Sequence, residues 1–337
     1  MIGRRVRQWR ELARMARVYI RVRHGGWAKR LAEARVPLGS LTVSRDSGRI
    51  TMREFGLSLS LEQDFFLGGL AVARAIKREG GRFRQDQQGR LLCEIGGVTV
   101  TIRTLEELRM MSETFVDGVY NIVTEGPVIV WDIGMNVGLV SLYFATREHV
   151  RVIGYEPIRR TYELALENLA LNPALRDRIV PVHLGVGGSD RTESVLCCDE
   201  LRGSVGIRGV VNDPVLRRLL FGVSNMTTTF WHEEMVLQDA TRILTAIRAE
   251  HPSLPVIAKI DCEGAEYEII ESLHRSGQLP QLHAVLIEWH RDGPAPLIGR
   301  LTNAGFTVVA PGPRADLWGM VYAIRGPEAR SLSLSDA

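Results

Sequence analysis

From residue 127 onward, apolar and polar positions follow a regular order along the chain. Short apolar runs of strand length alternate with stretches in which apolar side chains recur every three to four positions, as in an amphipathic helix. Alternating strands and helices predict a parallel sheet with helices on both faces. The predicted strands are 128–134, 150–157, 178–185, 255–264, 283–290, 305–310 and 318–324, and the predicted helices are 138–147, 159–172, 233–250, 265–275 and 296–304.

The order of these elements predicts where a ligand would bind. The last two strands are too close in sequence for a crossover helix, so we expect them to pair antiparallel. Right-handed crossovers between the other strands place their carboxyl ends at one edge of the sheet. In open α/β sheets of this kind, ligands bind outside that edge.

Polar residues and glycines stand at the ends of the predicted strands. In chain order they are Asp132, Gly134, Asn136 and Gly138, then Glu156, then Gly185 to Gly188 with Val186 among them, then Lys259, Asp261 and Glu263, and finally Glu288 and His290. A single acid at a strand end carries little information, but several that converge on one edge favour a binding site.

The first turn, Asp-x-Gly-x-Asn-x-Gly, differs from the Gly-x-Gly-x-x-Gly turn of dinucleotide-binding proteins. The alternatives are a purely structural turn and, for Glu156, a solvated strand end. The first turn together with Glu156 instead suits a nucleoside ligand without a pyrophosphate. Glu156 would accept hydrogen bonds from the ribose hydroxyls of that ligand. S-adenosylmethionine fits this description, with its methionyl tail over Gly134 to Gly138 and its adenine near Val186. Asp132 would orient the turn or bind the methionyl amine.

Several motifs together resemble the FkbM family of S-adenosylmethionine-dependent methyltransferases, over roughly residues 112 to 325. They are "ETFVDGVY", "WDIGMNVGLVSL", "GYEP", "NLALN", "LGVGGSD" and "KIDCEGAEYEII", of which "KIDCEGAE" is the most specific. The resemblance implies the class I methyltransferase fold, a Rossmann-like α/β fold with a mostly parallel seven-stranded sheet. It also implies S-adenosyl-L-methionine as cofactor, and acceptors that are mostly hydroxyls of sugars or natural products. The first hundred residues and an insertion at 189–232, predicted to be a substrate lid, depart from the family pattern.

Methyl transfer to a hydroxyl needs a group that takes the proton, and the candidates are Asp261, His290 and Glu263. Lys259 could instead form a structural ion pair with Asp261 or with Glu266. A divalent-metal site formed by Asp261, Glu288 and His290 is the further alternative. We expect no metal, because the acids are spread out rather than clustered.

We therefore predict an S-adenosylmethionine-dependent methyltransferase, most simply an O-methyltransferase acting on a sugar, glycan or natural product. One alternative is N-methylation of a small molecule. Another is a methyltransferase-fold binding protein without turnover. A nicotinamide oxidoreductase is disfavoured by the first turn.

The distribution of charge separates the start of the chain from the rest. Residues 1–35 hold 11 Lys and Arg against two acids, a balance of +9, so the rest of a chain with net charge +3 sums to −6. They predict a basic amphipathic helical arm. Such an arm either packs on residues 36–126, a small mixed α/β region, or makes peripheral contact with an anionic membrane surface. The predicted methyltransferase domain is 127–326, and 327–337 is a flexible tail.

The mildly acidic body predicts no nucleic-acid partner. Four cysteines without zinc-site spacing, no apolar membrane span and no secretory signal predict a cytoplasmic protein, with the inner face of the membrane as an alternative place for the arm. The pattern does not predict an oligomeric state.

Overall fold

The computed structural model describes residues 41–44, 49–124, 126–213, 215, 229–312, 317–325 and 332–334. The chain divides into two compact units, Met1–Gly118 and Val119–Ala337. The predicted basic arm and its membrane contact lie outside the described residues, so they stay predictions. No helix in the described part of the chain is long and apolar enough to cross a membrane.

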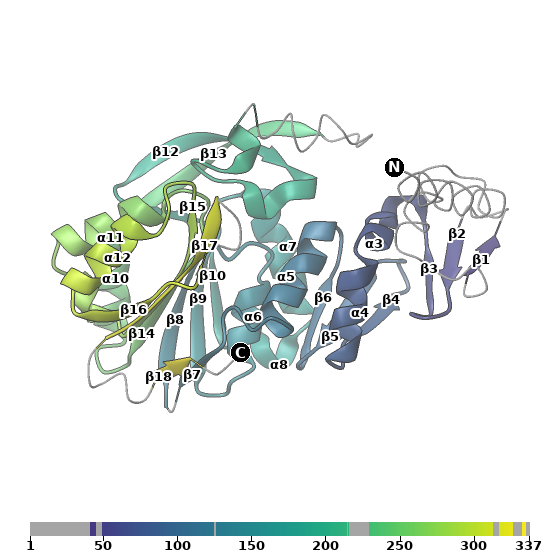
Figure 1. Ribbon diagram of the computed structural model, residues 1–337, viewed down its shortest axis with the longest axis horizontal. Helices are drawn as coiled ribbons and strands as arrows, with labels where there is room; N and C mark the ends of the chain where they lie inside the picture. The colour runs from purple at the N-terminus through teal and green to yellow at the C-terminus, as the bar shows by residue number, and fades with distance from the viewer. Residues whose placement is uncertain are drawn as a thin grey trace, which may run out of the picture. The chain divides into compact units, whose positions relative to one another are not determined.

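The first unit contains two antiparallel three-stranded sheets and several helices (Figure 1). One sheet is formed by β1 (Leu41–Ser44), β2 (Arg49–Met52) and β3 (Leu57–Leu59), and the other by β4 (Arg82–Gln85), β5 (Leu91–Ile95) and β6 (Val98–Thr101). The helices are η2 (Leu61–Gln63), α3 (Phe65–Gly68), α4 (Leu70–Arg78) and α5 (Leu105–Phe115). Phe55, Phe66 and Phe83 meet edge to face in its core, with ring centroids 5.2–5.7 Å apart.

The second unit is built on a seven-stranded sheet in the order β10-β9-β8-β14-β15-β17-β16. Its strands are β8 (Val128–Ile133), β9 (Val150–Tyr155), β10 (Ile179–Val182), β14 (Val256–Ile260), β15 (Ala284–His290), β16 (Phe306–Val309) and β17 (Trp318–Arg325). The first five run parallel, and β17 pairs antiparallel with both β15 and β16. This strand order confirms the predicted class I methyltransferase sheet, including its antiparallel end.

Helices cover both faces of this sheet, with α10, α11 and α12 on one side and α6, α7 and α8 on the other (Figure 1). They are α6 (Leu139–Ala145), α7 (Arg159–Ala170), α8 (Pro173–Arg176), α10 (Ala240–Glu250), α11 (Glu266–Arg275) and α12 (Ala295–Asn303), with the short turns η3 (Asp199–Ser204), η4 (Val210–Asn212) and η5 (Leu279–Gln281).

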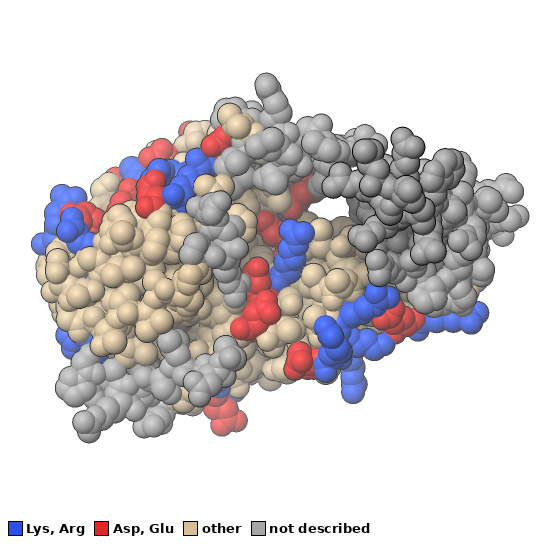
Figure 2. Space-filling model, in the orientation of Figure 1, with Lys and Arg blue, Asp and Glu red and all other residues tan. Residues whose placement is uncertain are grey.

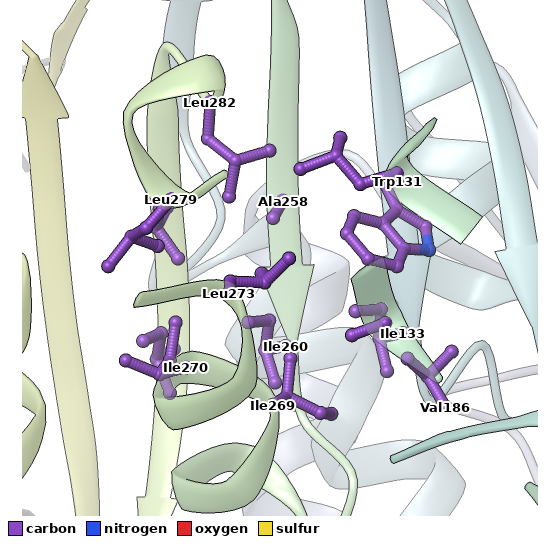
Figure 3. Close-up of a cluster of buried hydrophobic side chains, with 14 of the residues drawn as sticks. Trp131, Ile133, Val186, Ala258, Ile260, Ile269, Ile270, Leu273, Leu279 and Leu282 are labelled. Carbon is purple, nitrogen blue, oxygen red and sulfur yellow. The ribbon is translucent and has the colours of Figure 1, made fainter. Parts of the chain in front are cut away.

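The packing of α11 on the two central strands explains why those strands are almost entirely apolar. Trp131, Ile133 and Ile260 from the sheet meet Ile269 and Leu273 from α11, and all five are at most 1% exposed (Figure 3). β8 and β14 are buried at every position because helices lie on both faces.

A second, three-stranded sheet, formed by strands within and on either side of the insertion at 189–232, differs from the sequence prediction. It has the order β11-β13-β12, with β11 (Gly185–Gly187), β12 (Arg191–Cys198) and β13 (Phe230–Asp239). The predicted helix at 233–250 is wrong over its first part, because residues up to Asp239 pair with β12 and only 240–250 are helical. The predicted third strand is also shorter, since β10 ends at Val182 and Gly185 begins a strand that pairs with β13.

Two short strands near the two ends of the second unit pair with each other. β7 (Ile122–Thr124) pairs with β18 (Leu332–Leu334), so the unit begins at Val119, ahead of the predicted 127, and takes in part of the predicted tail. Arg275 and Arg300 both pair with Glu271, and Figure 2 shows acidic and basic side chains interspersed on the face in view.

Candidate functional site

A pocket opens at the carboxyl ends of β8, β9 and β14, with an empty volume, including its mouth, of about 590 Å³. Six of the residues predicted from the sequence line it: Gly134, Asn136, Glu156, Val186, Asp261 and Glu263. The other three, Asp132, Gly138 and His290, are not among the lining residues. The structure therefore brings most of the predicted site together.

Gly134 is required by the approach of the neighbouring strand end. Its φ is +80°, and a Cβ there would lie 1.8 Å from the backbone carbonyl oxygen of Asp261. The amides of Gly134 and Met135 both donate to the carbonyl of Tyr155. The turn is thus held between β9 and β14, and only glycine fits against the Asp261 backbone.

Gly138 and Asp132 do not line the pocket but stabilise the turn. Gly138 has a φ of +79° at the start of α6, where a Cβ would be 3.4 Å from that of Ala165. Asp132 is fully buried, accepts a 2.6 Å hydrogen bond from the Ser141 hydroxyl and lies 3.0 Å from the Lys259 ammonium.

Glu156 bridges two loops beneath the pocket. One carboxylate oxygen accepts the amide of Asn136 and the other accepts the amide of Ile158, each at 2.9 Å. The side chain is buried, and this burial raises the pKa of Glu156 to about 7 despite both hydrogen bonds. Each oxygen still has a lone pair that could accept a hydrogen bond from a ligand hydroxyl.

Lys259 joins the first turn to the end of β14. Its ammonium donates to the carbonyl oxygen of Gly134 at 2.7 Å and lies 3.8 Å from the Asp261 carboxylate. Burial opposes this charge, but Asp132 and Asp261 outweigh it, so the pKa of Lys259 is raised. Its main ionic partner is Asp132, which the sequence had not suggested; Asp261 lies farther away.

Asp261 lines the pocket with a side chain that is 24% exposed. The Tyr120 hydroxyl donates to its Oδ2 at 3.2 Å. The carboxylate is therefore oriented from two sides, by a phenol and by an ammonium, while it stays open to the pocket.

Glu263, Glu266 and His290 form a buried group beside the pocket. His290 Nε2 lies 3.4 Å from Glu263, and Nδ1 lies 3.2 Å from Glu266. Burial raises the pKa of Glu263 to about 8. Burial acts against the charge of His290, yet Glu263 and Glu266 raise its pKa to about 10. A raised pKa favours the protonated imidazole, which takes up no further proton, while the role of His290 as the base stays a prediction from the sequence.

Part of the pocket lining is apolar and comes partly from the insertion. Val186 lies there with Met235, Leu237 and Ile207, while Gly206 packs against Glu263. Met235 and Leu237 were missed because the segment was taken for a helix. Their alternating burial appears only in the structure, since "MVL" is a continuous apolar run in the sequence and gives no period-two signal.

Within the described part of the chain, no three His, Cys, Asp or Glu side chains are arranged to hold a metal ion. The alternative of Asp261, Glu288 and His290 as metal ligands therefore has no support from the arrangement of these side chains.

A family model described as "Methyltransferase FkbM domain" matches residues 132–308, which is more than half of the chain. The chain belongs to the FkbM methyltransferase family. The match covers the strand ends from Asp132 to His290, so it includes the whole pocket edge. It confirms the resemblance and, with it, S-adenosylmethionine as the methyl donor of this protein.

Individual relatives of this FkbM methyltransferase are distant. "Methyltransferase sdnD" of Sordaria araneosa is 25% identical over 223 residues, which are 61% of this chain and 85% of the relative. Methyltransferase FkbM from Methylobacillus flagellatus KT is 15% identical with a TM-score of 0.37, and the alignment covers 59% of this chain and 43% of that one. Magnesium protoporphyrin IX methyltransferase (ChlM) from Synechocystis PCC 6803, solved with bound SAM, is 11% identical with a TM-score of 0.31, covering 60% and 71%.

Proposed function

We propose that the protein transfers a methyl group from S-adenosylmethionine to a hydroxyl of a sugar, glycan or natural product. The observation that carries the proposal is a pair of carboxylates, Asp261 and Glu263, on the same pocket as the glycine turn and Glu156. The first acid can orient an acceptor hydroxyl, and either acid can take its proton.

The residues of the pocket fit S-adenosylmethionine. Glu156 has acceptor capacity for two ribose hydroxyls, and Val186, Met235 and Leu237 offer an apolar surface for adenine. The turn from Gly134 to Asn136 would face the methionyl part. When bound, the cofactor supplies an activated methyl group, so the protein mainly has to align the acceptor with it.

The carboxylates favour a hydroxyl over an amine as acceptor. An alcohol must lose a proton as it is methylated, and a positioned base contributes about 10²- to 10⁴-fold to such a step. A neutral amine needs no base before attack. N-methylation therefore remains the second candidate and would leave these two acids without a chemical task.

The test is a screen of the full chain with labelled S-adenosylmethionine against glycosides, lipids and polyketides, together with calorimetry of S-adenosylhomocysteine. We expect label in a hydroxyl-bearing acceptor. Asp261→Asn should slow turnover at least tenfold, with cofactor affinity close to that of the parent. Asp177→Asn, at an exposed position after α8, is the matched control.

Binding of S-adenosylhomocysteine without transfer to any acceptor would point to a binding protein. Transfer to amines alone, unaffected by Asp261→Asn, would contradict O-methylation.

A further inference from the structure

The imidazole of His290 is enclosed by carboxylates at the end of β15. Both ring nitrogens face a glutamate: Nδ1 lies 3.2 Å from Glu266 and Nε2 lies 3.4 Å from Glu263. A third, Glu288, lies 3.9 Å from Nε2. An ionised carboxylate only accepts hydrogen bonds, so when Glu263 and Glu266 are both ionised the arrangement favours a proton on each ring nitrogen.

Glu266 anchors this group to the backbone. It is fully buried, and its two oxygens accept the amide of Gly264 at 2.7 Å and the amide of His290 at 2.8 Å. It thereby ties the loop after β14 to the end of β15 and fixes the ring at Nδ1. The Tyr267 hydroxyl, which donates to the carbonyl of His290 at 3.1 Å, holds the same residue from α11.

Glu263 is the member of the group that reaches the pocket. It has a φ of +53°, a region that non-glycine residues seldom adopt and that concentrates at functional sites. Its carbonyl accepts the amide of Arg208, whose side chain pairs with Asp292. The backbone of Glu263 is thus held from the insertion while its carboxylate is held by His290.

We propose that His290 is a positioning residue whose imidazolium, anchored by Glu266, fixes the Glu263 carboxylate where the acceptor hydroxyl loses its proton. This role rests on the proposed function. The acceptor O–H proton passes to an oxygen of Glu263 as the oxygen–methyl bond forms and the sulfur–methyl bond breaks. Asp261, whose Oδ2 already accepts the Tyr120 hydroxyl, then orients the acceptor.

Burial and the neighbouring charges determine the pKa values of His290 and Glu263. Burial lowers the pKa of His290, but Glu263, Glu266 and Asp261 outweigh it and raise this pKa to about 10. Glu288, 3.9 Å from Nε2, is a further acid beside the ring. The same burial and the neighbouring acids raise the pKa of Glu263 to about 8, although His290 lowers it. A carboxylate with a pKa in this range is suited to act as a base near neutral pH.

The first test is independent of any acceptor. In the full chain labelled with ¹⁵N-histidine, we expect the His290 ring signals, assigned with His290→Asn, to stay those of an imidazolium up to about pH 9. Glu263→Gln and Glu266→Gln should each lower the midpoint by about one pH unit or more. Glu250→Gln, at an exposed acid, should leave it unchanged. A parent midpoint near the ordinary value, or one unmoved by both glutamine variants, overturns the inference.

The second test separates positioning from a purely structural role. With an acceptor from the screen, Glu263→Gln should lower kcat about 10²-fold or more at pH 8. His290→Gln should lower kcat and move the acidic limb of the pH profile upward, because Glu263 loses its cation. If His290→Gln binds S-adenosylhomocysteine normally, turns over normally and keeps the acidic limb of its pH profile where the parent has it, the inference is overturned. The proposed function would then still stand. If the parent methylates nothing, the proposed function fails, while the titration still decides the state of His290.

Discussion

A buried glutamate links backbone amides at two places on the pocket edge, and its charge is balanced differently at each. At the end of β8 and β9, Glu156 accepts the amides of Asn136 and Ile158. At the end of β14 and β15, Glu266 accepts the amides of Gly264 and His290. Each buried carboxylate therefore ties together the carboxyl ends of two neighbouring strands.

The difference lies in how the buried charge is balanced. Glu156 is stabilised mainly by two amides, and burial still raises its pKa to about 7. Glu266 instead lies within 3.2 Å of the His290 imidazole. Glu156 can therefore still accept hydrogen bonds from the hydroxyls of a ligand. The charge of Glu266 is instead balanced by His290, whose ring can also hold Glu263 in place.

The largest expected effect is on the free energy of unfolding, at Lys259, which links the ends of β8 and β14. Lys259→Met should cost about 3–5 kcal/mol of unfolding free energy, because the fully buried Asp132 loses its cation. Chemical denaturation of the full chain measures it. Adding Asp132→Asn should recover more than half of the loss, and a single-variant cost below about 1 kcal/mol would show that the ion pair does not couple the ends.

Gly134→Ala should destabilise the protein by about 3 kcal/mol, since a Cβ would collide with the Asp261 carbonyl and the φ is positive. Gly277→Ala is the matched control, with a φ of +70° and nothing within 4 Å of the added Cβ. It should cost only about 1–2 kcal/mol. Equal losses in thermal denaturation would mean that the close approach of the two loops contributes nothing.

Glu156→Gln should weaken S-adenosylhomocysteine binding by about 1–3 kcal/mol in calorimetry, because hydroxyl donors lose a charged acceptor. Glu163→Gln, at an exposed position of α7, should bind like the parent. Unchanged affinity in Glu156→Gln would place the ribose elsewhere.

The smallest effect is a pH dependence at the same end. The pKa of Glu156 is about 7 in the free protein, and ligand hydroxyls favour its ionised form. Binding then releases a proton, so affinity for S-adenosylhomocysteine should fall by up to about tenfold from pH 8 to pH 6. Glu156→Gln should remove this slope, and a slope that persists in it would have to come from another group.

The sequence by itself determined the sheet, its edge and most of the lining. The apolar runs of β8 and β14 are buried throughout, so their pattern leaves little alternative to central strands. The positions of Gly134, Glu156 and Asp261 follow directly, because the residue after a parallel strand must emerge at the shared edge.

Tertiary structure alone decided the partners and the charges. β13 is a strand because it pairs with β12, although "HEEMVLQD" is compatible with a helix. Lys259 pairs chiefly with Asp132, and the pKa of His290 is raised because Glu263 and Glu266 reach its ring. These contacts join segments that lie far apart in the chain or leave loops in directions that local sequence does not set, and burial then fixes which groups stay charged.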